Sequence, residues 1–355
     1  MNGGHEGWRE PRSGPDVWTG AEFLARDDWT HDLNADEVDD LEHAVASVRA
    51  AGAGLYHGTA ADFPLPCLGR RLAAITQALE HGCGVANVRG IPLGRFSLED
   101  LRVALWGIGT HLGIAVSQNS SGEFFAEVRD YGEQLGLAHS RGYRSNVALR
   151  FHTDRCDVAA LLCARQCREG GENRIVSTPA IHNAMLERCP DLLRELYCTY
   201  CHSRQGEQVA GQRRYYQSPV FAQHRGRFTS QYSRAYVESA QAFEEVARLR
   251  PRQDEALDAL ARCADELAAQ VRMGDGDILL LNNHVTYHSR TAIVDWDEPS
   301  RKRLLYRLWL SVPSSRELPQ CFTELWGDTA AGAVRGGVTP PSRLRDVQAW
   351  RRANG

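Results

Sequence analysis

Apolar residues recur at helical spacing in several stretches of this chain, each opened by a capping pattern. In the segment 32–52, apolar side chains repeat every three or four positions after Asn34, and Glu37 stands three residues further on. Ser97 and Asp100 make the same kind of start for a helix. A small polar residue followed three positions later by an acid satisfies the free amides of a first helical turn, so both stretches are predicted to be helices.

Two further helical regions follow from the same periodicity. A stripe of leucine, alanine and valine predicts a helix over 254–272, and Pro190 divides the region 178–197 into two helical pieces. Residues 1–18 are rich in glycine, proline and charge, and we expect them to lack fixed structure. The polar stretch 203–217 is expected to be a loop that could lie over the site.

Other stretches carry the patterns of strands. Residues 147–151 lead into His152, and the short apolar run 278–281 ends at two asparagines. In the segment 303–312, Arg303 and Arg307 share one face while leucines and a tyrosine occupy the other. No repeat, dinucleotide-binding glycine motif or P-loop occurs, so the pattern indicates a mixed α/β protein.

Composition narrows the class of protein. The 355 residues are enough for one large catalytic domain or two small ones. The formal net charge is −4 and the chain has no long basic run, so the sequence gives no sign of a nucleic-acid-binding surface. No apolar stretch reaches the ~20 residues of a membrane span. The first residues lack the apolar core of a secretory signal, which favours the cytoplasm, where the ten cysteines would be reduced and mostly buried.

The candidate chemistry begins at His152 and Asp154, which lie two residues apart after a predicted strand. That spacing points both side chains to one face, where His288 could join them from a distant strand. Two histidines and one carboxylate on one face of a metal suit a non-haem Fe(II) oxygenase. Arg303, on the strand that follows, offers a planar bidentate cation for a cosubstrate carboxylate.

The residues around these positions resemble the TauD/TfdA family of Fe(II)- and 2-oxoglutarate-dependent dioxygenases. The resemblance runs in the family's order through about three quarters of the chain, over HGCGVANVRGIP, GIGTHLGIAVSQNSSGE, RGYRSNVALRFHTDRCDVAALLC, REGGENRIVSTPAIHNAMLERCPDLL, SPVFAQHRGRFTSQYSRAYV, GDGDILLLNNHVTYHSRTA, RKRLLYRLWLSV and VRGGVTPP. It implies a double-stranded β-helix, or jelly-roll, core with flanking helices in a single catalytic domain over 19–355.

The resemblance also implies roles for single residues. His152, Asp154 and His288 would be the metal ligands. Spacing from the first of two asparagines, followed by x-Arg, favours His288 over His284. Arg303 would pair with the C5 carboxylate of 2-oxoglutarate. Asn173 stands where the family often has serine or threonine and could donate the same hydrogen bond, or it could be an exposed loop residue.

Candidate substrate residues are less sharply marked. Arg307 lies ~13 Å along its strand from Arg303 and could face the substrate or form a structural ion pair. Gln118 and Asn119 resemble a segment that borders the family's substrate pocket, although they could be ordinary turn residues. Arg234 is a weaker candidate, for which a structural role is favoured.

The expected activity is oxidation of an aliphatic C–H, most simply hydroxylation, with 2-oxoglutarate and O₂ converted to succinate and CO₂. Desaturation or ring closure would use the same ligands. The alternatives from other classes are a zinc hydrolase on the same three ligands and a non-catalytic jelly-roll binding protein. The expected substrate is a small, polar and anionic metabolite, and the sequence leaves a homo-oligomer open.

Overall fold

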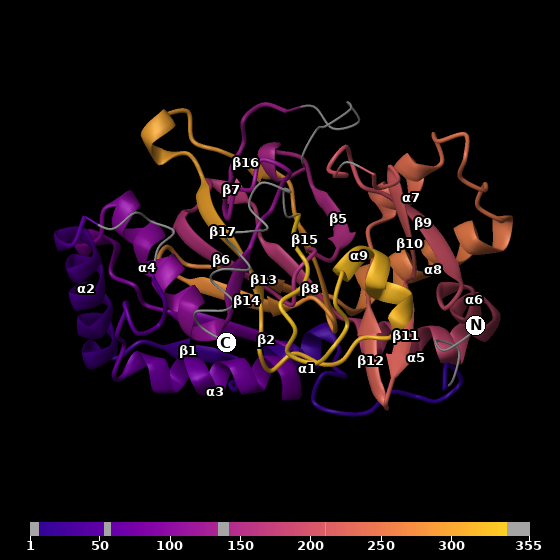
Figure 1. Cartoon of the computed structure of the whole chain (residues 1–355), viewed down its shortest axis with the longest axis horizontal. Coiled ribbons are helices and arrows are strands. Elements are labelled where there is room, and N and C mark those ends of the chain that lie inside the picture. Colours follow the sequence, from indigo (N-terminus) through magenta and orange to yellow (C-terminus); the bar gives the residue numbers. More distant parts are fainter. Residues whose placement is uncertain (1–6, 53–57, 134–141, 210, 339–355) are drawn as a thin grey trace.

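Two packed β-sheets form the centre of the protein in the computed structural model, which describes residues 7–52, 58–133, 142–209 and 211–338 (Figure 1). The larger sheet has the order β1-β2-β14-β6-β17-β3, and β4 also pairs with β17. Its strands are β1 (Thr30–Asp32), β2 (Val85–Arg89), β3 (Ile114–Val116), β4 (Phe125–Val128), β6 (Val158–Arg165), β14 (Ile278–Asn282) and β17 (Leu304–Ser311).

The smaller sheet has the order β13-β8-β15-β5 and carries most of the site described below. Its strands are β5 (Leu149–His152), β8 (Asn173–Ser177), β13 (Ala269–Val271) and β15 (Thr286–Arg290). Three two-stranded ladders flank the two sheets. They pair β7 (Glu169–Gly170) with β16 (Ile293–Val294), β9 (Thr199–Ser203) with β10 (Tyr215–Pro219), and β11 (Phe221–His224) with β12 (Arg227–Ser230).

Apolar side chains from the facing sides of both sheets form one core. Leu161, Leu279 and Leu305 of the larger sheet meet Ile175 and Val271 of the smaller sheet. Because side chains alternate along a strand, the remaining apolar positions of the larger sheet point outward and must be covered by helices. This arrangement of two facing sheets is the expected jelly-roll with helices outside.

Helices cover the outer faces of the two sheets (Figure 1). The larger sheet is packed against α2 (Ala35–Ala50), α3 (Leu68–His81) and α4 (Leu98–Leu112), through a core that includes Leu304 and Leu308 of β17. Behind the smaller sheet lie α5 (Thr178–Arg188), α6 (Pro190–Leu196) and α8 (Pro251–Leu267). The short helices are α1 (Gly20–Leu24), α7 (Arg234–Ala240) and α9 (Thr323–Trp326).

Several local predictions agree with these elements. Asn34 and Ser97 cap α2 and α4 in complete capping boxes with Glu37 and Asp100. Pro190 opens α6, so the region 178–197 does form two helices. The alternation predicted for 303–312 is present over Leu304–Ser311, which form β17, and Arg303 directly precedes this strand.

Other local predictions are wrong. The helix expected over 254–272 ends at Leu267, because the next residues turn to an extended backbone and pair as β13 with the edge of β8. Residues 7–18 are not free of structure either. Backbone groups of Arg12 hydrogen-bond to the Asn183 side chain, and Trp18 is buried with its Nε1 donating to the Cys83 carbonyl at 3.0 Å. Residues 1–6, and 339–341 at the end of the VRGGVTPP stretch, lie outside the described residues.

The stretch 203–217 is a loop only in its middle. Ser203 is the last residue of β9 and Tyr215 is the first residue of β10. These two residues are partners at the end of the antiparallel β9–β10 ladder. Tyr215 and Tyr216 are buried, so they belong to the fold and not to an exposed loop. β10 begins with two buried tyrosines at the end of a polar run, and so short a signal does not mark a strand in the sequence.

Candidate metal and cosubstrate site

Strand pairing brings the two candidate histidines together. His288 of β15 is the register partner of His152 of β5, and their ring centroids lie 4.4 Å apart. Asp154 follows β5, and its Oδ2 lies 3.8 Å from Nε2 of His288. One ligand atom from each of the three residues lies within 4.8 Å of the others. Of the residues that the structure describes, these three form the one such group that could hold a metal ion.

The protonation states suit metal binding. Burial lowers the pKa of His288 to about 3, assisted by the nearby His152 ring, so the imidazole is neutral at pH 7. Burial alone would raise the pKa of Asp154, but Arg307 and the two histidines lower it, and the net shift is downward. A neutral imidazole and an ionised carboxylate are the forms that coordinate a metal.

Neighbouring groups hold these ligands in place. Nδ1 of His152 lies 2.9 Å from the Arg150 carbonyl, which can only accept, so Nε2 is left free for a metal. Nε1 of Trp309 donates to Oδ2 of Asp154 at 2.8 Å. The side chain of Asn283 accepts from the Asp154 backbone at 2.9 Å. Such partners fix ligand orientation, and sequence reasoning did not identify Trp309 or Asn283.

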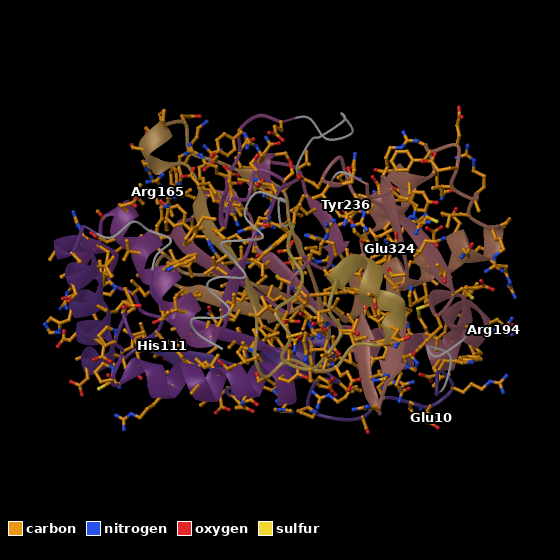
Figure 2. The ribbon with its side chains drawn as sticks, viewed as in Figure 1. Glu10, His111, Arg165, Arg194, Tyr236 and Glu324 are labelled. Atoms are coloured by element: carbon orange, nitrogen blue, oxygen red, sulfur yellow. The ribbon has the colours of Figure 1, made fainter. Side chains whose placement is uncertain are left out.

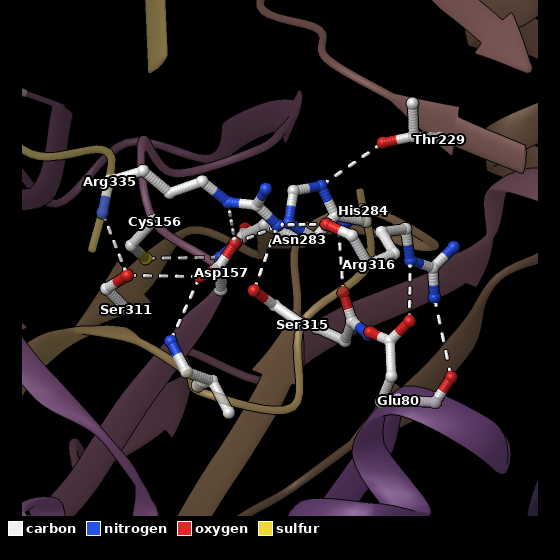
Figure 3. A network of polar contacts seen from close by, with 12 residues as sticks. Glu80, Cys156, Asp157, Thr229, Asn283, His284, Ser311, Ser315, Arg316 and Arg335 are labelled. Carbon is white, nitrogen blue, oxygen red and sulfur yellow. Dashed lines mark hydrogen bonds and ion pairs between the residues drawn. The ribbon is translucent and has the colours of Figure 1, made fainter. Parts of the chain in front are cut away.

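His284 lies in a separate buried network (Figure 3). Its Nε2 is 2.7 Å from Oδ1 of Asp157, and its Nδ1 is 3.1 Å from the Thr229 hydroxyl. Arg335 donates to the same Asp157 oxygen at 2.9 Å. Because both ring nitrogens of His284 are engaged, it does not compete with His288 for a metal.

A second cluster next to this triad consists of buried hydrogen-bond donors that lack acceptors. Arg303 is 1% exposed, and its Nε and Nη1 have no partner among the described residues. Nε and Nη1 of Arg290 and Nδ2 of Asn173 are in the same condition. Arg290 and Asn173 are register partners across β15 and β8. Burial, with a smaller contribution from the charge of Arg303, lowers the pKa of Arg290 to about 10.

Buried donors without acceptors are costly, so this cluster fits an anionic ligand. The carboxylate of 2-oxoglutarate has the acceptors that Arg303, Arg290 and Asn173 lack, and the adjacent His-Asp-His group would leave room for its 2-oxo acid end. Arg290 was not among the predicted residues, although it is the arginine of the His-x-Arg pattern used to select His288.

Gly171 explains how Arg303 is accommodated. Its φ is +71°, in the left-handed region that favours glycine. A Cβ atom there would lie 2.7 Å from Sγ of Cys167 and 3.2 Å from Nε of Arg303. The glycine therefore lets the backbone approach the guanidinium closely.

The candidate substrate residues fall into two groups. Arg307 is buried, with Nη1 at 3.2 Å from Oδ1 of Asp154 and Nε donating to Oε1 of Gln118 at 2.8 Å. Gln118 donates in turn to the Arg307 carbonyl at 2.7 Å. Asn119 is engaged within its own turn, where its Oδ1 accepts from the Glu123 amide at 3.1 Å. The structure thus brings Arg307, with Gln118 bound to it, to the triad, whereas Asn119 is bonded within its own turn.

Arg234 does not join this group. It opens α7, where it forms ion pairs with three carboxylates, those of Glu238, Asp254 and Asp258. Because carboxylates of α7 and α8 balance its charge, Arg234 is not proposed as a substrate-binding residue.

A jelly-roll with a His-x-Asp…His group and a buried arginine just before a following strand is typical of dioxygenases of the non-haem iron class. The family model for "Taurine catabolism dioxygenase TauD, TfdA family" matches residues 49–309. The chain belongs to the TauD/TfdA family, as its sequence motifs had indicated. It is therefore an oxidoreductase whose cofactor and cosubstrates are Fe(II), 2-oxoglutarate and O₂.

Individual relatives agree with this assignment. The chain is 32% identical over 335 residues to FR-33289 synthase from Streptomyces rubellomurinus, covering 91% of this chain and 97% of that protein. It is 24% identical over 307 residues to a taurine hydroxylase-like protein from Stachybotrys chartarum, covering 82% and 77%.

Solved structures share the fold. Asparagine oxygenase in complex with Fe(II), 3-hydroxyasparagine and succinate has a TM-score of 0.62 at 16% identity, over 80% of this chain and 93% of that one. The non-haem iron oxygenase OrfP with Fe and alpha-ketoglutaric acid has a TM-score of 0.59 at 16% identity, over 79% and 94%.

Proposed function

We propose that this protein hydroxylates an aliphatic carbon of a small, polar, anionic metabolite, with His152, Asp154 and His288 holding the iron. One observation carries the assignment: buried donors without acceptors lie beside a group of three metal-ligating side chains. Arg303, with Arg290 and Asn173, would hold the distal carboxylate of 2-oxoglutarate. When bound, the iron supplies the activation of O₂ that lets a substrate C–H, 2-oxoglutarate and O₂ become a C–OH, succinate and CO₂.

The protein's own side chains perform three tasks in this proposal. Trp309 and Arg307 hold the Asp154 carboxylate in one orientation. Arg303 and Arg290 supply positive charge in a buried place, where an ion pair with a carboxylate is stronger than in water. Burial of Asp154 and His288 limits water at the metal, which disfavours side reactions.

Arg307 and Gln118 are placed where they could bind a polar group of the substrate. They form one hydrogen-bonded unit that contacts Asp154, so a substrate group held there would lie beside the metal. Structurally similar enzymes bind small molecules: asparagine oxygenase forms a complex with 3-hydroxyasparagine, and OrfP forms one with (3S)-hydroxy-L-Arg. Desaturation or ring closure remains the alternative outcome on the same residues.

We also propose one catalytic domain in the cytoplasm. All ten cysteines are free, as expected in a reducing compartment. Among the described residues, no helix is both long enough and apolar enough to cross a bilayer.

The test is a turnover screen with Fe(II) and 2-oxoglutarate over amino acids, sulfonates, aryloxy acids and betaines. Succinate release is measured first, and mass spectrometry then identifies a product 16 mass units heavier for hydroxylation or 2 lighter for desaturation. Hydrolysis with Zn²⁺ and no succinate would instead indicate the zinc hydrolase. Ligand binding without any 2-oxoglutarate turnover would indicate the binding protein.

A further inference from the structure

A cavity of about 470 Å³ lies next to the metal site and is not used by the residues assigned so far. Its walls come from β3 and the turn that follows, from the loop after β9, from α9, and from 334–338. Its size is within the ~300–1,000 Å³ range of small-molecule sites.

Three residues in the cavity wall are neighbours of the metal ligands or of the residues bonded to them. Arg155, in its wall, directly follows Asp154. Val116, also in the wall, is the register partner of Trp309, whose Nε1 donates to Asp154. Ser117 precedes Gln118, which is bonded to Arg307. A ligand in the cavity would therefore lie alongside the groups that hold the metal.

Two arginines in the wall lack carboxylate partners at hydrogen-bond distance. Within the described part of the chain, Arg155 has neither a side-chain hydrogen bond nor an ion pair, and its guanidinium carbon lies 5.8 Å from the Tyr216 ring centroid. Arg204 is 5% exposed, lies 5.4 Å from the same ring, and its Nε has no partner. Its Nη2 donates to the Glu324 backbone carbonyl at 3.0 Å and lies 3.9 Å from the Glu324 carboxylate. Burial, and then the charge of Arg155, lower the pKa of Arg204.

The acids in the wall are engaged elsewhere. Glu324, labelled on α9 in Figure 2, binds Arg213 at 2.7 Å and accepts from the Gln217 amide at 3.0 Å. Asp328 accepts from the Ala330 amide at 2.9 Å. Glu207 accepts from the backbone of Ser120.

The third arginine in the wall, Arg335, is neutralised by Asp157 at 2.9 Å. Arg155 has no carboxylate partner among the described residues, and the carboxylate nearest to Arg204 is 3.9 Å away, so these two arginines are the ones that an anion in the cavity would meet.

We propose that Arg155 and Arg204 bind an acidic group of the primary substrate, a carboxylate, sulfonate or phosphate, at the end remote from Arg307. Two guanidinium charges near one ring repel each other, and an anion bound by both would relieve that repulsion. A planar guanidinium matches an oxyanion in two-point contacts. This inference rests on the proposed function and narrows its substrate class to small molecules with an acidic group beyond the polar end that faces the metal.

The experiment measures binding of inorganic phosphate by calorimetry to the enzyme loaded with Fe(II) and saturating 2-oxoglutarate, without O₂. Saturation fills the Arg303 site, so that phosphate reports on the cavity. Arg155→Gln and Arg204→Gln should each weaken phosphate binding about 10-fold or more, as expected for the loss of a charge-assisted hydrogen bond. Arg214→Gln is the matched control, because Arg214 also lies over an aromatic ring, that of Phe243, but outside the cavity.

Arg155 is only partly buried, so Arg155→Gln decides the result if Arg204→Gln does not fold. No phosphate binding by the wild type, equal affinity in wild type and Arg155→Gln, or an equal loss in Arg214→Gln overturns the inference. Succinate formation in the turnover screen tests the proposed function separately. A phosphate site without succinate points to failure of the function, and succinate without a phosphate site points to failure of the inference.

Discussion

Nη1 of Arg307 contacts both carboxylate oxygens of Asp154, at 3.2 and 3.3 Å. A single guanidinium thus supports one proposed metal ligand while its Nε binds Gln118 at 2.8 Å. Arg303 directly precedes β17 and Arg307 lies within it, and the two arginines reach different groups. Arg303 reaches the cluster of unpaired donors near Asn173, and Arg307 reaches the carboxylate of the triad.

This relationship predicts a double effect of Arg307→Ala. The apparent KM for the primary substrate should rise while 2-oxoglutarate binding stays nearly intact, and iron affinity should fall about 10-fold because Asp154 loses a supporting partner. Trp309→Phe is the matched control, since it removes a donor to Asp154 without removing a charge. It should weaken iron binding with little change in substrate KM. An unchanged substrate KM in Arg307→Ala would remove its proposed role in substrate binding.

The metal ligands are tested by stoichiometry. His152→Ala, Asp154→Ala and His288→Ala should each abolish turnover and leave less than one iron per chain in equilibrium dialysis. His284→Ala should keep its iron, although losing the buried hydrogen bond to Asp157 should lower the free energy of unfolding by about 1.5–3 kcal/mol. Dialysis is therefore done well below the unfolding transition. A folded His284→Ala without iron, beside an iron-loaded His288→Ala, would reverse the assignment.

Arg303 is tested through the cosubstrate. Arg303→Leu should raise the apparent KM for 2-oxoglutarate about 10- to 100-fold, since a charge-assisted contact contributes ~1.5–3 kcal/mol. Arg303→Lys should recover part of this loss, because an ammonium lacks the bidentate geometry. Arg301→Leu, which alters an exposed arginine two residues away, should leave the KM unchanged. Equal KM values in wild type and Arg303→Leu would transfer the role to Arg290.

Gly171→Ala tests the same site through the backbone. Strain at a φ of +71° and the close approach to Cys167 and Arg303 should displace the guanidinium. The expected result is a higher KM for 2-oxoglutarate with normal iron binding. Gly211→Ala is a suitable control, because Gly211 has a φ of +84° but no atom within 4 Å of the added Cβ. A normal KM in a folded Gly171→Ala would show that the approach is not needed.

Buried neutral histidines should make the protein sensitive to acid. Burial lowers the pKa of His202 to about 4, and the ring is stacked on Tyr216 at 4.9 Å. His202 takes up a proton more readily in the unfolded chain than in the folded protein. The stability that the neutral, buried ring contributes is therefore complete above about pH 6.5 and is lost as the pH falls toward 4. Between pH 7 and pH 5 the wild type should lose about 2 kcal/mol through this group.

His202→Phe keeps an aromatic ring against Tyr216 and removes the titration. Urea unfolding at pH 7 and pH 5 should therefore show a smaller difference in the free energy of unfolding for this variant than for the wild type. The same difference in both proteins would mean that His202 does not contribute to the acid sensitivity.

The order of neighbouring residues by itself determined where helices start and which side chains share a face. Asn34 and Ser97 marked two helix starts because a capping box involves only residues three apart. The spacing of His152 and Asp154 placed them on one side of the chain, and alternation along 303–312 placed Arg303 and Arg307 on one face. These properties depend on contacts within a few residues, which sequence patterns record.

Only the tertiary structure decided which distant groups meet. Pairing of β15 with β5 set His288 opposite His152 and directed His284 to Asp157 instead. The same pairing of chain-distant strands placed Arg290 beside Asn173. Arg234 and Arg303 carry the same formal charge. Three carboxylates pair with Arg234, whereas no carboxylate among the described residues pairs with Arg303. The partner of a buried charge depends on segments far away in the sequence, and for that reason charge type alone could not assign these roles.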